Sequence, residues 1–146
     1  MTSKKLLDML NEGIKQELHV SMKYMWQHIF VKGIEGAVVE KLLRDIAITE
    51  MKHAEALAER VSVLNGVPPN KFDEVHVGEI LVEMLTEDVQ TEEAAINLYK
   101  QAIQAASKDG DFTTRRLLED ILSDEEKHLD TFSKLLVGMT SPFTQP

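Results

Sequence analysis

Four glutamates and two histidines in this sequence have the residue types and the spacing that a pair of metal ions needs. Each glutamate interrupts a segment in which apolar residues recur every three or four positions, and each histidine follows a glutamate by three residues. The six residues are Glu17, Glu50, His53, Glu92, Glu125 and His128. On a helix, side chains three positions apart are neighbours on one face, so a Glu-x-x-His pair can bind one ion together.

Charge balance favours a single site for all six residues. Four carboxylates in apolar seams would repel one another and would lose several kcal/mol each through desolvation. Two divalent cations would balance the four negative charges, and neutral imidazoles would fill further coordination positions. Oxygen and nitrogen ligands of this kind suit iron or manganese, and the sequence by itself does not separate the two metals.

The second half of the chain repeats the candidate ligands of the first half at an offset of 75 residues. Glu17 therefore corresponds to Glu92, and the pair 50/53 corresponds to the pair 125/128. The rest of the two halves is barely similar. A repeat that survives mainly at the candidate ligands predicts two metals related by an approximate two-fold axis.

Tyr24 lies seven residues after Glu17 and so on the same helical face, and Tyr99 has the same relation to Glu92. We predict that Tyr24 donates a hydrogen bond near the metals or supplies a further electron, with Tyr99 the weaker candidate. The alternative is a core tyrosine whose hydroxyl is satisfied by a neighbour. We do not expect the remaining histidines, His19, His28 and His76, to be ligands.

The elements that must position these residues are four long helices. All four prolines and most glycines fall between the periodic segments. The predicted helices are residues 3–32, 37–65, 77–107 and 111–137. Short links join the first to the second and the third to the fourth, whereas the middle link contains two prolines and can span the bundle. This predicts an all-α bundle over residues 1–137, with one long crossover between helices two and three, and a short tail over 138–146.

Composition narrows the class of protein. The 146 residues include no cysteine, which excludes disulfides, thiolate metal sites and cysteine nucleophiles. The formal net charge of −9 gives no bulk attraction to nucleic acid or to anionic membranes. No apolar run is long enough to cross a membrane and no signal peptide is recognised, so we expect a cytoplasmic protein with no nucleic-acid or membrane partner.

Three segments carry a resemblance to bacterioferritin, a ferritin-like family: EMKHAE at 50–55, HVGEILVEML at 76–85 and SDEEKHLD at 123–130. The resemblance covers nearly the whole chain and implies that the six residues are the ligands of two iron ions per subunit. It implies that Glu50 and Glu125 bridge the irons, that Glu17 and His53 complete one, and that Glu92 and His128 complete the other.

The function implied by this resemblance is ferroxidase activity with iron storage. Fe(II) would be oxidised to Fe(III) by dioxygen or hydrogen peroxide, inside a homo-oligomeric cage. A redox partner such as a ferredoxin would supply electrons for release of the stored iron. The resemblance also implies a haem shared between two subunits, with Met51 as the axial ligand from each. Met22 and Met25 would line the same surface, and Trp26 is predicted to be packing or interface.

This sequence departs from the family pattern at two places. The short fifth helix that helps build the family's 24-subunit cage is missing, which favours a dodecamer. The inner-surface iron site next to the second helix is not reproduced, because Asp45 and Thr49 occupy its histidine and aspartate positions.

Two other functions remain open from the sequence. A di-iron redox enzyme without storage, such as a rubrerythrin-like peroxide reductase or a manganese catalase-like protein, would need much the same site. Rubrerythrins usually carry a cysteine-rich domain, however, and this chain has no cysteine. A non-catalytic helical assembly module with an acidic core is the second alternative, and for it metal removal would leave stability unchanged.

Overall fold

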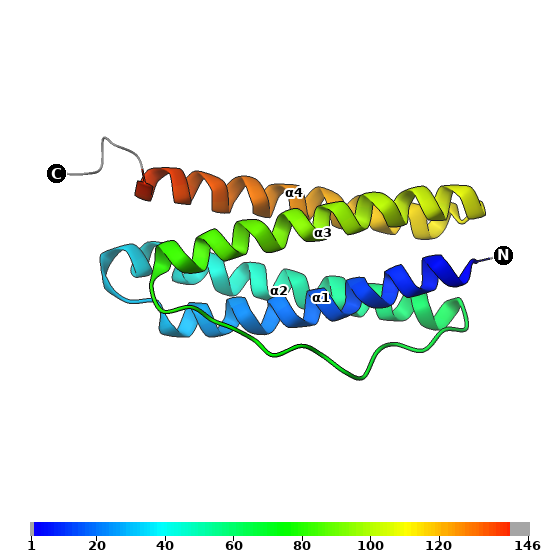
Figure 1. Cartoon of the computed structure of the whole chain (residues 1–146), viewed down its shortest axis with the longest axis horizontal. Coiled ribbons are helices and arrows are strands. Elements are labelled where there is room, and N and C mark those ends of the chain that lie inside the picture. The colour runs from blue at the N-terminus through cyan, green and yellow to red at the C-terminus, as the bar shows by residue number, and fades with distance from the viewer. Residues whose placement is uncertain (1, 141–146) are drawn as a thin grey trace.

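The computed structural model describes residues 2–140 and contains four long helices in this range (Figure 1). Their bounds are Lys4–Phe30 (α1), Gly33–Val63 (α2), Leu81–Asp109 (α3) and Phe112–Thr140 (α4). The all-α prediction is confirmed. Each helix begins or ends up to four residues from its predicted limit. The last residues of the predicted tail, 141–146, lie outside the described part of the chain.

Two tight links make two antiparallel hairpins. α1 and α2 are separated by only Val31 and Lys32, and Gly33 begins α2 with a φ of 74°, a value that glycine adopts without strain. Gly110 links α3 to α4 in the left-handed region with the same φ, so it caps α3. α1 packs closely on α2 and α3 packs closely on α4, whereas α2 and α4 approach each other at few places.

Residues 64–80 form the predicted long crossover, which runs the length of the bundle beside α1 (Figure 1). Three side chains of α1, spaced eight residues apart, hold it in place. Asn11 donates to the Val67 carbonyl at 3.0 Å and Gln27 to the Val77 carbonyl at 3.3 Å, and His19 Nε2 lies 2.9 Å from the Glu74 carbonyl. These bonds explain how a segment without helices or strands keeps a fixed path.

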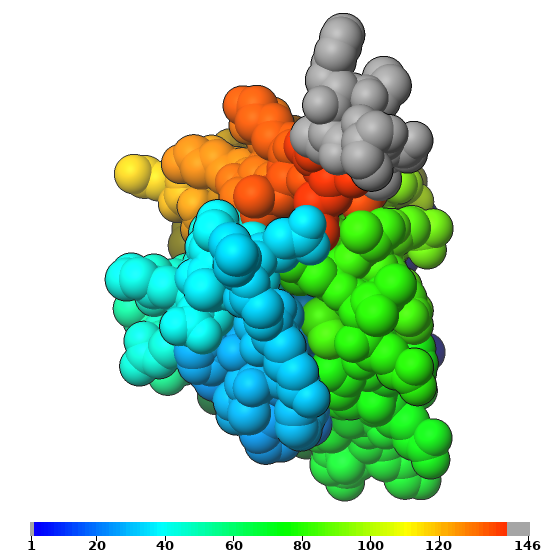
Figure 2. Space-filling view, turned by 90° about the vertical axis from the view of Figure 1, so that its left-hand side faces the viewer, coloured from blue at the N-terminus to red at the C-terminus, as the bar shows by residue number. Residues whose placement is uncertain are grey.

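The bundle core consists of two apolar clusters that lie toward opposite ends. One cluster includes Leu6, Leu10, Leu57 and Leu118, and the other includes Leu43, Leu85 and Phe132. Figure 2 views the bundle from one end, where the α1–α2 link meets the start of α3 and the end of α4. Glu17, Glu50, Glu92 and Glu125 lie between the two clusters along their helices, so apolar packing on both sides holds these helices in register.

Candidate di-metal centre

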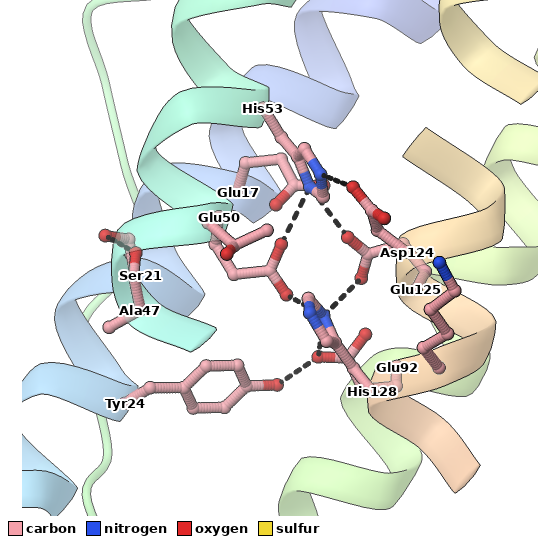
Figure 3. Close-up of polar contacts among 12 residues, drawn as sticks. Glu17, Ser21, Tyr24, Ala47, Glu50, His53, Glu92, Asp124, Glu125 and His128 are labelled. Carbon is pink, nitrogen blue, oxygen red and sulfur yellow. Dashed lines mark hydrogen bonds and ion pairs between the residues drawn. The ribbon is translucent and has the colours of Figure 1, made fainter. Parts of the chain in front are cut away.

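Each helix contributes one fully buried glutamate at its middle. Glu17 of α1, Glu50 of α2, Glu92 of α3 and Glu125 of α4 are each 2% exposed or less. The two histidines extend from the same helices as their glutamates, with His53 on α2 and His128 on α4. The structure therefore brings all six sequence-predicted residues together in the middle of the bundle (Figure 3).

The six residues form two overlapping groups, and in each group one potential ligand atom per residue lies within 4.8 Å of the others. The first group is Glu17, Glu50, His53 and Glu125. The second group is Glu50, Glu92, Glu125 and His128. Glu50 and Glu125 belong to both groups, so their two oxygens are placed to bridge two ions.

Both histidines present the same ring nitrogen to the bridging carboxylates. His53 Nδ1 lies 2.9 Å from Glu50 Oε2 and 2.9 Å from Glu125 Oε1. His128 Nδ1 lies 2.9 Å from Glu50 Oε1. The two rings are stacked with centroids 6.4 Å apart. A cation placed between these ring nitrogens and the carboxylates would therefore meet both kinds of ligand.

Burial changes the acid–base behaviour of the cluster. Burial raises the pKa of Glu17 to about 8, of Glu125 to about 8 and of Glu92 to about 10. Burial lowers the pKa of His53, but its hydrogen bonds with neighbouring carboxylates outweigh burial and hold that pKa well above its usual range. Without cations the cluster therefore retains protons at neutral pH.

The donor set fits two metal ions by a second criterion. Glu17 Oε2 and Glu92 Oε2 are buried and have no hydrogen-bond partner among the described residues. Unpaired buried oxygens cost free energy unless a cation or a proton meets them. Each of these oxygens belongs to a different metal group, so one cation per group would satisfy both.

Two tyrosines cross between the hairpins to reach terminal glutamates. Tyr24 of α1 donates to Glu92 Oε1 at 2.7 Å, and Tyr99 of α3 donates to Glu17 Oε1. Each tyrosine thus bonds the glutamate of the other hairpin rather than its own. Each tyrosine follows the glutamate of its own helix by seven residues, a rise of about 10 Å. Its hydroxyl therefore lies nearer to the glutamate of the neighbouring helix than to the glutamate of its own helix.

A carboxylate that the sequence prediction missed completes the surroundings of His53. Asp124 Oδ2 lies 2.8 Å from His53 Nε2, the ring nitrogen that faces away from the bridging glutamates. The sequence feature that could have predicted this role is the position of Asp124 immediately before Glu125, on the turn that faces α2.

A groove between α1 and α3 lies close to the site. A narrow cavity of about 10 Å³, room for about one water, is lined by Glu17, Glu92 and Glu125. It shares Gln16, Val20 and Thr91 with a larger groove of about 480 Å³ on the outside of the bundle. The metal centre is therefore separated from the outer surface by only a few side chains.

A second cavity, of about 560 Å³, lies outside the bundle over α1, α2 and the crossover. Its lining is mainly apolar and includes Met22, Met25, Trp26, Met51 and Phe72. The structure places all three methionines of the predicted haem surface in this one pocket. Met51 is 48% exposed, so its thioether points away from the bundle core.

The other histidines lie away from the centre. His19 contacts the crossover, and His28 Nδ1 lies 2.7 Å from the Glu40 carbonyl. His76 is exposed and lies near Glu83 and Glu87 in a group that could hold an ion. Exposed acidic groups of this kind are common without a metal, and nothing else in the structure indicates a ligand there.

Comparisons with known proteins agree with this architecture. The Ferritin-like domain family matches residues 7–140. The bacterioferritin of Desulfovibrio desulfuricans is 33% identical over 132 residues, which cover 90% of this chain and 74% of that protein. None of the helices within residues 2–140 is both long and apolar enough to span a membrane.

Solved structures give the same result. A D. desulfuricans bacterioferritin structure that describes a diiron site matches with a TM-score of 0.86 and 30% identity, covering 95% of this chain and 83% of that one. A ferritin-like diiron-carboxylate protein from Bacillus anthracis matches with a TM-score of 0.87 and 28% identity, covering 91% and 96%. Rhodobacter capsulatus bacterioferritin, with a metal-free dinuclear site and a haem iron, matches with a TM-score of 0.85 and 28% identity, covering 93% and 86%.

A four-helix bundle with one long crossover and a buried carboxylate–histidine cluster defines a ferritin-like protein. Within that class, the matches over most of its length show that the chain belongs to the bacterioferritin family.

Proposed function

We propose that this chain is a ferroxidase subunit of a cytoplasmic, homo-oligomeric iron store. The observation that carries the proposal is the pair of overlapping ligand groups in which Glu50 and Glu125 are common to both. Two Fe(II) ions bound side by side are the substrate, and each gives up one electron. Dioxygen accepting both electrons and two protons becomes hydrogen peroxide; hydrogen peroxide accepting the same becomes two waters.

The residues of the chain supply charge and protons for this reaction. Four carboxylates favour the harder Fe(III) product, whereas imidazole retains affinity for Fe(II). Because the metal-free glutamates keep protons near neutral pH, binding of Fe(II) displaces protons inside the site. Tyr24 holds Glu92 through its hydroxyl, so it fixes the orientation of a terminal ligand and lies close enough to donate an electron or proton.

The groove between α1 and α3 is the route we propose for Fe(II) to reach the centre from outside. Gln16, Val20 and Thr91 separate it from Glu17 and Glu92. The net charge of −9 attracts cations to the protein as a whole. For assembly we propose a homo-oligomer, a dodecamer rather than a 24-mer, and a ferredoxin-like donor that would reduce the stored iron.

Oxygen-dependent iron uptake tests the function directly. Fe(II) is added in steps to the metal-free protein in air, and Fe(III) formation is followed by absorbance. We expect a fast phase that ends at two irons per chain, followed by slower uptake of many more irons that stay in solution. A fast phase of two irons without storage would instead support a di-iron redox enzyme.

A haem between two subunits is the second part of the proposal. The 560 Å³ pocket has the size and apolar lining of a cofactor site, and Met51 offers an exposed thioether at its wall. When bound, haem would supply an electron path between the stored iron and the outside. The R. capsulatus relative, which contains a haem iron, supports this assignment.

Met51→Ala is expected to abolish stable haem binding, because the axial sulfur would be lost. The measurement is haem bound per chain, from the Soret band after reconstitution and gel filtration. Met22→Ala is the matched control, since Met22 lines the same pocket and is equally exposed at 49%. Equal haem content in both variants would remove Met51 as the ligand.

A further inference from the structure

The two histidines of the di-metal centre differ at the ring nitrogen that faces away from the metals. His53 Nε2 lies 2.8 Å from Asp124 Oδ2. No hydrogen bond to His128 Nε2 is found among residues 2–140. Each Nδ1 atom lies 2.9 Å from an oxygen of Glu50, and His53 Nδ1 also lies 2.9 Å from Glu125 Oε1.

The internal repeat shows where the matching partner of His128 would be. Asp124 corresponds to Thr49 at the offset of 75 residues that relates all the ligands. The Thr49 hydroxyl donates to the Asp45 carbonyl of its own helix at 3.2 Å. One half of the approximate two-fold site therefore has a carboxylate behind its histidine, and the other half has a hydroxyl that is bonded elsewhere.

A carboxylate behind a ligating histidine has defined chemical effects. It accepts the Nε2 proton, fixes the tautomer that leaves the Nδ1 lone pair for the metal, and makes that nitrogen more basic. Removal of such a partner typically lowers metal affinity about 10–100-fold. The ring of His53 is also held from both sides, by Glu50 and Asp124, before any ion arrives (Figure 3).

We propose that Asp124 is a positioning residue for His53, and that it makes the metal position of Glu17 and His53 the tighter one, which fills first. The position of Glu92 and His128 fills second. This inference rests on the di-metal function proposed above. It gives the two irons of one centre different affinities although their direct ligands have the same types.

A Co(II) titration of the metal-free protein tests the assignment without any turnover. Co(II) prefers the same ligand types as Fe(II), and its visible absorption reports its coordination geometry. For the unaltered protein we expect two steps of unequal affinity, with one ion bound in each. Asp124→Ala should weaken the first step about 10–100-fold, so that the two steps merge. Asp124→Asn keeps a hydrogen-bond acceptor and should restore part of the difference.

Asp120→Asn is the matched control, because Asp120 is an exposed aspartate one turn earlier on α4. It should leave both steps unchanged, and circular dichroism of each metal-free variant checks the fold. An unaltered protein that binds two ions in two steps, together with an Asp124→Ala protein that gives the same curve, would overturn the role of Asp124 alone. An unaltered protein that binds no Co(II) would overturn the di-metal function as well.

Discussion

Glu50→Ala combined with Glu125→Ala is expected to abolish the fast phase of Fe(II) oxidation. These are the two glutamates common to both ligand groups, so the double variant leaves each group with one glutamate and one histidine. Two ions would then have no shared ligand to hold them side by side, and a two-electron transfer to one oxidant would fail. Loss of a residue that only supports a metal ligand typically lowers metal affinity or activity about 10–100-fold. For loss of both shared ligands we therefore expect the oxidation rate to fall by more than about 100-fold.

The matched control is Glu93→Ala combined with Glu126→Ala. Each of these glutamates is the exposed neighbour, on the same helix, of a buried ligand. The control removes the same charge from the protein and should oxidise Fe(II) at the parent rate. Stopped-flow absorbance at two irons per chain gives the comparison. A parent-like fast phase in the Glu50/Glu125 double variant would show that oxidation occurs elsewhere.

Removal of metal should make the stability of the protein fall as the pH rises, the reverse of ordinary acid denaturation. Glu17 and Glu125 have folded pKa values of about 8, and Glu92 of about 10, against 4.5 when unfolded. Above pH 4.5 the unfolded chain therefore loses protons that the folded chain keeps. Each such group lowers the free energy of unfolding by about 1.4 kcal/mol per pH unit until its folded pKa is reached.

Urea unfolding of metal-free and metal-loaded protein at pH 6, 7 and 8 measures this effect. The metal-loaded protein should lack the decline, because bound cations keep the carboxylates ionised in the folded state. Glu92→Gln removes one titrating group with little change of shape and should reduce the metal-free slope by about 1.4 kcal/mol per pH unit. Metal-free stability that is flat or rises over this range would show that the glutamates are already ionised. Equal stability of the metal-free and metal-loaded proteins would support the non-catalytic alternative.

The helices were predictable from the sequence because their apolar periodicity and the prolines between them are strong signals. The residues at which the helices begin and end were less predictable. α3 begins at Leu81 rather than at 77 because Gly78, with a φ of 91°, belongs to the crossover. α2 begins at Gly33 rather than at 37, since one glycine makes the whole turn from α1.

The meeting of the six buried residues also followed from the sequence, because their spacing repeats at a fixed offset. The hydrogen-bond partners of these six residues could not be predicted from the sequence. Tyr24 donates a hydrogen bond to Glu92 because α1 packs beside α3. The sequence of α1 alone does not show which helix packs beside it. Asp124 is partly exposed and resembles any surface acid until its distance to His53 is known.

A buried ion pair escaped prediction for a similar reason. Lys23 has the sequence character of a surface residue, yet its side chain is 7% exposed and lies 3.8 Å from the fully buried Asp88. In the sequence, Asp88 lies four residues before Glu92 and so on the same face of α3. Gln27 completes the group by donating to Asp88 at 2.9 Å. Charged pairs of this kind depend on contacts between helices that no local pattern records.

Because the bundle consists of two hairpins, metal ions at its centre would connect one hairpin to the other. α2 and α4 have few backbone contacts with each other, yet they carry both bridging glutamates and both histidines. An ion in either group would be held mainly by one hairpin and joined to the other by a single bridging glutamate. The two ions would therefore cross-link the α1–α2 hairpin to the α3–α4 hairpin. Metal occupancy would then increase with the stability of the contact between the two hairpins.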